Sequence, residues 1–161
     1  MLSIRLKRTS ALTAEGRDVA RRRGAVGLRN TECMFDDIGT AVPEESFVEL
    51  LIQLVPESRN LVDEHFADYD ELLIHLLMSD LLRFATAAFA HDDIDLTQRL
   101  LQFLDHALRE GDERVNNAVA VSFVENIGTH EGETPEFIAS WPRGLLDERD
   151  RQRRGDPTTT S

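Results

Sequence analysis

The sequence has very little of several residue types that would define a site by themselves. Cys33 is the only cysteine among 161 residues, so an internal disulfide and a thiolate zinc cluster are both excluded. It lies in a polar stretch without a neighbouring histidine, whereas a reactive thiol needs electropositive surroundings. Since reduced thiols are usual in the cytoplasm, we expect a cytoplasmic protein.

Catalytic and nucleotide-binding signatures are also missing. The chain has no glycine-rich phosphate loop, no His-Glu-x-x-His zinc motif and no Gly-x-Ser-x-Gly elbow. Its uninterrupted apolar runs are much shorter than a membrane helix, which requires about 18 residues. The sequence therefore predicts a protein without a cofactor that does not cross a membrane and is not an enzyme.

Positive charge is scarce outside the first part of the chain. The whole sequence holds 30 acidic and 18 basic residues, a net charge of −12. Residues 1–34 carry a net charge of +5, and residues 35–161 carry −17. Such a negative surface repels phosphate backbones, which argues against nucleic acid as a ligand and favours a basic protein partner.

Residues 1–34 also lack the pattern of a folded segment. They have no sustained apolar period, contain the basic run Arg21 to Arg23, and lack the apolar stretch of a secretory signal. Two interpretations remain open. The segment is either a disordered basic arm or the product of a misassigned start codon, with translation beginning at Met34.

From residue 43 onward, apolar residues recur with helical spacing. One helix follows Pro43 and a second follows Pro56. The third begins with Asp70 as its N-cap and is apolar almost all round over residues 72–90, which predicts the buried centre of a bundle. Phe66 and Tyr69 belong to the apolar stripe expected for the second helix.

The second half of the chain continues this pattern. Asp93 is expected to cap a fourth helix that ends at Gly111, and Asp112 to cap a fifth that packs antiparallel to it as a hairpin. A short sixth helix opens at Thr134 and is stopped by Pro142. The fold class is therefore all-α: a compact irregular bundle of five to six helices over residues 35–146, followed by a disordered tail over 147–161.

Residues of the types that bind metals cluster between positions 64 and 80. Glu71 and His75 are four residues apart on the predicted third helix, and His65 and Asp68 are three apart on the preceding one. If the two helices lie antiparallel, these four side chains could hold one metal ion. Capping and core roles explain the same residues, so no metal site is assigned and the four stay weak candidates.

Other charged residues suggest a buried pair and an interaction surface. Asp80 and Arg83 lie three apart in the most apolar helix, which predicts a buried, mutually neutralising pair. Acidic groups at two successive helix starts, together with the only tryptophan, are the interaction candidates. These candidates are Asp92, Asp93, Asp95, Asp112, Glu113 and Trp141.

Several segments of the sequence resemble a family of uncharacterised small bacterial proteins that are acidic and all-helical. These segments are residues 54–57, 111–114 and 121–126, and the segment from Asp68 to Leu73 with His75, Met78, Asp80, Leu81 and Arg83. The resemblance covers residues 43–140. It implies an all-helical domain of unknown function, some of whose relatives look like immunity or accessory proteins, and it assigns no catalytic residue.

Three functions remain open at this point. The leading hypothesis is a protein-interaction module, for instance an immunity-type protein that neutralises a basic partner. The alternatives are a metal-binding bundle or small metal-dependent enzyme, and a structural accessory subunit. The sequence does not determine the specific partner or the oligomeric state.

Overall fold

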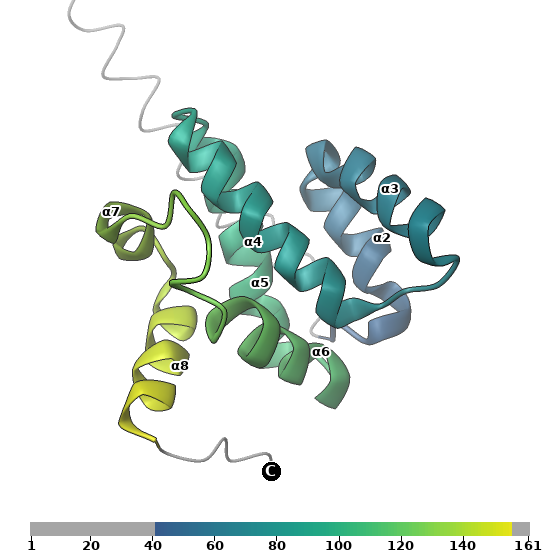
Figure 1. Cartoon of the computed structure of the whole chain (residues 1–161). Helices are drawn as coiled ribbons and strands as arrows, with labels where there is room; N and C mark the ends of the chain where they lie inside the picture. The colour runs from purple at the N-terminus through teal and green to yellow at the C-terminus, as the bar shows by residue number, and fades with distance from the viewer. Residues whose placement is uncertain (1–40, 156–161) are drawn as a thin grey trace, which may run out of the picture. The chain divides into compact units, whose positions relative to one another are not determined.

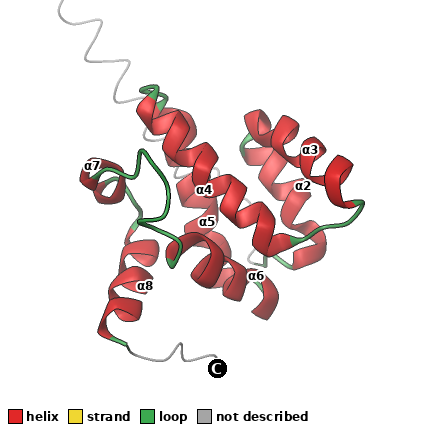
Figure 2. Cartoon of the chain, in the orientation of Figure 1, coloured by secondary structure: helices red, strands yellow, loops and turns green. Residues whose placement is uncertain are grey.

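The computed structural model describes residues 41–155, which are helical with no strand among them (Figures 1 and 2). This confirms the all-α prediction, whereas the predicted basic arm, residues 1–34, lies outside the described residues. A 3₁₀ turn, Pro56–Ser58, precedes α3, and a π-helical turn, Val119–Val124 (η2), continues α6. The α-helices are α2 (Glu44–Leu54), α3 (Arg59–Tyr69), α4 (Ile74–Ala90), α5 (Ile94–Glu110), α6 (Glu113–Ala118), α7 (Pro135–Ala139) and α8 (Arg143–Arg154).

Helix α4 is the centre of the core, as its apolar composition predicts. It packs against α3, α5, α6 and η2, and Figure 1 shows it crossing the domain in front of α5. Leu77, Met78, Leu81 and Leu82 are fully buried. One side of the helix nevertheless reaches solvent, since Leu76 keeps 44% of its surface exposed.

The connection between α5 and α6 also holds the start of α2. Asp112 caps α6, because its Oδ1 accepts the Val115 N–H at 2.9 Å, and its Oδ2 accepts the Glu44 N–H of α2 at 2.7 Å. Desolvation acts to raise the pKa of Asp112, but the hydrogen bonds from backbone N–H groups outweigh it and lower the pKa. One aspartate therefore serves as the cap of two helices.

Helix α5 is tied to α2 at its other end. Asp93 caps it as predicted, accepting the Leu96 N–H at 3.3 Å. Arg99 donates to the Leu54 carbonyl oxygen at 3.0 Å and to Glu57 at 2.7 Å. The hydrogen bond from Arg99 lowers the pKa of the Glu57 carboxyl group.

The predicted disordered tail is wrong for residues 147–154, because α8 continues to Arg154 and buries Leu145 and Glu148. Pro142 offers no side-chain cap to this helix. Instead, the buried Asp105 of α5 accepts the Leu145 N–H at 3.1 Å. Gly144 allows that approach, since a Cβ atom there would lie 2.4 Å from Asp105 Oδ1. Residues 156–161 lie outside the described part of the chain.

The predicted role of Asp70 is also wrong. Asp70 is the left-handed C-cap of α3, with φ of 57°, and its N–H donates to the Phe66 carbonyl oxygen at 3.0 Å. Helix α4 begins four residues later, at Ile74. The reason is tertiary: the Leu73 N–H donates to Nε2 of His65 at 3.0 Å, which holds the connecting segment against α3.

Candidate functional site

The four metal candidates do not meet at one point. His65 and Asp68 line a groove between α3 and α4, whereas Glu71 and His75 line a separate pocket at the start of α4. Nε2 of His65 is occupied by the Leu73 N–H, and Nδ1 of His75 lies 2.8 Å from Ser122 Oγ. Within residues 41–155, no three side chains of His, Cys, Asp or Glu are placed to hold a metal ion. The expected shared helix face is lost because Glu71 precedes α4.

Asp80 and Arg83 form the expected ion pair, but the prediction that it is buried is wrong. Their side chains are 27% and 62% exposed, respectively. They lie on the side of α4 that faces the groove rather than the core. The almost continuous apolar composition of α4 hides this open side in the sequence.

The acidic interaction candidates do not form one surface. Asp92, Asp93 and Asp95 lie at the start of α5, and Asp112 and Glu113 lie beyond its end. A helix of 17 residues separates the two groups by about 25 Å. Asp93 and Asp112 are caps, and Asp95 pairs with Arg99 at 2.8 Å.

Trp141 is part of the core rather than of an interface. Only 4% of its surface is exposed. Its ring packs against Phe123 at a centroid distance of 5.4 Å and against Phe137 at 5.9 Å. It therefore closes the core between η2 and α7 and offers no surface to a partner.

A cluster of unpaired acidic side chains lies on α3 and the turn after it. Five carboxylates there form no ion pair or hydrogen bond with any residue of 41–155, and Arg59 is the only basic residue on α3. Most arginines of the described domain are paired with other acids, and none forms an ion pair with these five. We call these residues the α3 acidic face: Asp63, Glu64, Asp68, Asp70 and Glu71.

A groove of about 460 Å³ runs along this face, between α3 and α4. Its walls carry both charged and aromatic side chains, and the Asp80–Arg83 pair forms its far side. His65, which is almost fully buried, forms part of the wall and packs its ring 5.1 Å from that of Tyr69. The lining residues are Leu61, Glu64, His65, Asp68, Tyr69, Asp80, Arg83 and Phe84.

Two aromatic side chains of α3 are exposed beside the acids. Phe66 and Tyr69 keep 36% and 44% of their surfaces accessible, although the sequence pattern places them in the apolar stripe of the helix. Only Val62 and His65 of α3 are buried. The helix is therefore attached along a narrow strip, and Tyr69 also lines the groove.

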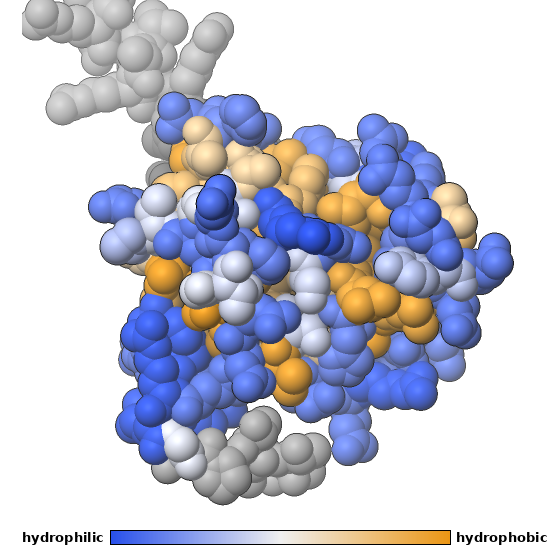
Figure 3. All heavy atoms as spheres, in the orientation of Figure 1, coloured by the Kyte–Doolittle hydropathy of each residue, from blue (hydrophilic) through white to orange (hydrophobic). Residues whose placement is uncertain are grey.

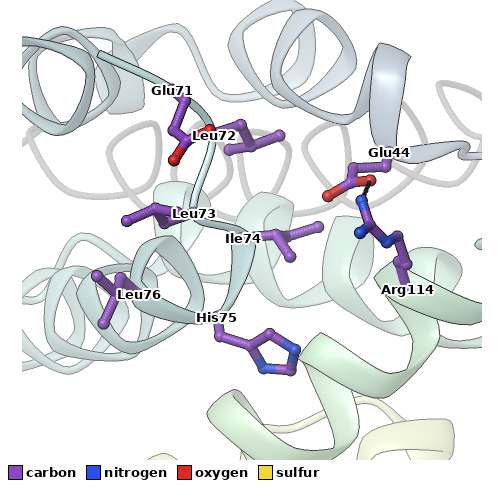
Figure 4. A pocket seen from close by; sticks show the side chains of 8 residues that line it. All are labelled: Glu44, Glu71, Leu72, Leu73, Ile74, His75, Leu76 and Arg114. Atoms are coloured by element: carbon purple, nitrogen blue, oxygen red, sulfur yellow. Dashed lines mark hydrogen bonds and ion pairs between the residues drawn. The ribbon is translucent and has the colours of Figure 1, made fainter. Parts of the chain in front are cut away.

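A second hollow, of about 480 Å³, lies on the other side of the α3–α4 connection. Figure 4 shows Leu72, Leu73, Ile74 and Leu76 around it, and Figure 3 shows apolar atoms gathered over the start of α4. The sequence reasoning missed this pocket because it placed residues 72 and 73 inside the helix. The remaining lining residues are Glu44, Glu71, His75 and Arg114.

Charge at this pocket is unevenly distributed. Arg114 and Glu44 form an ion pair at 2.6 Å, and the hydrogen bond to Glu44 raises the pKa of Arg114. Glu71 has no such partner in the described chain, and it belongs to both the pocket and the α3 acidic face. The two surfaces are therefore continuous at Glu71.

A family model described as a domain of unknown function, DUF7674, matches residues 48–155. The chain belongs to this family. That confirms the expected membership of an uncharacterised domain family, and the match extends past residue 140 to the end of α8. Neither the curated proteins nor the solved structures provide a match to this chain.

In the described part of the chain, no helix is long and apolar enough to cross a membrane.

Proposed function

We propose that this domain is a protein-interaction module that binds a basic protein segment through the α3 acidic face. The observation that supports the proposal most is the set of five carboxylates within nine residues that form no ion pair with any residue of the described chain. An immunity protein acting on a basic toxin and an accessory subunit of an assembly would both use such a surface. The genes next to this one would separate these two settings.

Electrostatic attraction explains why a basic partner would bind the α3 acidic face. Like charges on one short helix repel one another, and a cationic partner removes that repulsion as it binds. Opposite potentials also steer two proteins together and increase the association rate. Elsewhere in the domain, Glu44, Glu57, Asp95, Asp105 and Glu148 already pair with arginines, so a partner gains less there.

The side chains next to the acids fit the same partner. Tyr69 and Phe66 are half-exposed aromatic residues of the same helix, and Tyr69 lines the groove. An aromatic face attracts a guanidinium or ammonium group when the cation lies within about 6 Å of the ring. Tyrosine is also among the residues that contribute most binding energy at interfaces.

Binding of a synthetic dodecapeptide, (Gly-Arg)₆, to the full chain tests the proposal. We compare the triple variant Asp63→Asn, Glu64→Gln, Asp68→Asn with a control triple variant of exposed acids elsewhere: Glu49→Gln, Glu125→Gln and Glu131→Gln. Both variants change the net charge equally. Fluorescence anisotropy at low and physiological salt gives the dissociation constants.

The α3 variant is expected to bind roughly tenfold more weakly than the wild type, and the control less than about threefold, because only the former removes the local field. Affinity of the wild type should fall with added salt. Equal losses in the two variants would show that only the net charge matters and would refute the proposed surface. A complete lack of binding by the wild type would refute the function itself.

A further inference from the structure

We infer that the pocket at the start of α4 holds one apolar side chain of the basic segment that the α3 acidic face binds. This inference rests on the proposed function and extends it, because it names a second feature that the partner must carry. The pocket, called the anchor pocket from here on, has an apolar wall formed by Leu72, Leu73, Ile74 and Leu76. The occupant is a basic peptide segment with a leucine- or phenylalanine-sized side chain.

The wall of the anchor pocket is held in place before any partner arrives. Asp70 ends α3 in the left-handed conformation, and the Leu73 N–H donates to His65, which is almost fully buried. The Leu73 carbonyl oxygen in turn accepts the N–H groups of Leu76 and Leu77 at 2.9 and 3.0 Å. A connection fixed at both ends loses little conformational freedom on binding, which favours affinity.

Exposure shows that the wall has apolar surface left to cover. Ile74 is buried at 6% exposure, whereas Leu76, two residues further along, is 44% exposed and lines the same pocket. Figure 3 shows this apolar area bordered by hydrophilic atoms on the face in view. An exposed apolar area with a polar rim is typical of an interaction site.

Charge decides what kind of segment fits. Glu71 lies in the pocket lining and in the α3 acidic face, so a chain that places an apolar residue in the pocket runs next to one end of that face. Glu44, on the opposite side, is already neutralised by Arg114. An acidic segment would be repelled at Glu71, and the net charge of −12 disfavours an anionic membrane. A basic segment with one apolar residue satisfies both surfaces.

The test compares two peptides on the full chain: (Gly-Arg)₆ and the same peptide with one central glycine replaced by leucine. On the wild type, the leucine peptide should bind roughly tenfold more tightly, the usual effect of burying a side chain of this size. Leu76→Ser should reduce that gain to less than about twofold while leaving the affinity for (Gly-Arg)₆ unchanged. Leu72→Ser serves as a second variant, and circular dichroism confirms that each variant is folded.

Ile94→Ser is the matched control, because Ile94 is 43% exposed and lies at the start of α5, outside the pocket lining. It should preserve the full gain from leucine. Equal affinity of the two peptides for the wild type would overturn the anchor pocket and leave the proposed function standing, as would a gain that survives both leucine variants. If neither peptide binds the wild type, the proposed function is overturned, and this inference with it.

Discussion

The aspartates on and next to α5 and the carboxylates of α3 share one chemistry but have opposite surroundings. Asp105 and Asp112 accept N–H groups from helices far away in sequence, and each has an arginine nearby. The acids of α3 form no hydrogen bond or ion pair with their side chains among the described residues. Acidic composition therefore describes two different roles: capping groups that hold helices together, and a free negative surface.

Position in the domain explains the contrast. Helix α5 packs against α2, α4, α6 and α8, so an acid on it is close to the N-termini of other helices. Those N-termini present N–H groups and partial positive charge, which aspartate satisfies. Of helix α3 only Val62 and His65 are buried, and its acids are exposed to solvent. Substitutions in the two regions should therefore have different consequences.

The largest effect on stability is expected from Asp105→Ala. The substitution leaves the buried Leu145 N–H without an acceptor and Arg109 without its carboxylate, which lies 2.8 Å away. A lost buried hydrogen bond to a charged group typically costs about 2–3 kcal/mol, and we expect a loss of that size in the free energy of unfolding. Urea denaturation followed by circular dichroism measures it.

Asp105→Asn is the control for this prediction, because the amide keeps an oxygen that accepts the Leu145 N–H and removes only the charge. It should be less destabilising than Asp105→Ala. A loss below about 0.5 kcal/mol for the alanine variant, the range of ordinary surface substitutions, would contradict the role of Asp105 as the cap of α8.

Asp112→Ala should have the next largest effect, because one side chain caps both α2 and α6. Removing an N-cap typically costs about 1 kcal/mol, so two caps predict a loss of about 1–2 kcal/mol near neutral pH. Urea denaturation at several pH values measures the effect.

The stability difference between the wild type and Asp112→Ala should also depend on pH. The pKa of Asp112 is lowered in the folded protein, so the unfolded chain takes up the proton more readily. Its stabilising contribution is full above the unfolded value of about 3.9 and is lost as the pH falls through the lower folded pKa. The difference between wild type and Asp112→Ala should therefore shrink in strongly acidic buffer. A difference that stays constant with pH would contradict the capping role of the ionised carboxylate.

The smallest effect on stability is expected from Asp63→Asn together with Asp68→Asn. These groups have no partner to lose in the described chain, and removing like charges reduces repulsion. We expect a change within about 0.5 kcal/mol, in the stabilising direction. A loss above about 1 kcal/mol in urea denaturation would mean that the α3 acidic face has a structural role after all.

Local sequence was sufficient where a helix carries its own cap. Asp93, Asp112 and Thr134 each accept an N–H group three residues ahead, so the starts of α5, α6 and α7 follow from neighbouring residues. The apolar composition of residues 72–90 likewise identified α4 as the central helix. These features depend on contacts within one or two turns, which a sequence displays directly.

The candidate site could be predicted only in part. Glu64, His65, Asp68 and the Asp80–Arg83 pair stood out in the sequence, and they line the groove. Their arrangement in space could not be predicted, because the apolar pattern of the sequence does not show that α3 is attached along a narrow strip. For the same reason, Phe66 and Tyr69 were expected in the core, and the anchor pocket was missed.

The sequence by itself determined the helical class, the central helix and the negative charge of the domain, because periodicity and composition act through residues close in the chain. Only the tertiary structure decided that Asp105 and the second oxygen of Asp112 cap other helices, since the N–H groups that they accept belong to residues 40 and 68 positions away. It also decided where α4 begins, through the hydrogen bond from Leu73 to His65. A donor brought in from another helix leaves no trace in the local pattern, so these choices appear only when the helices are packed.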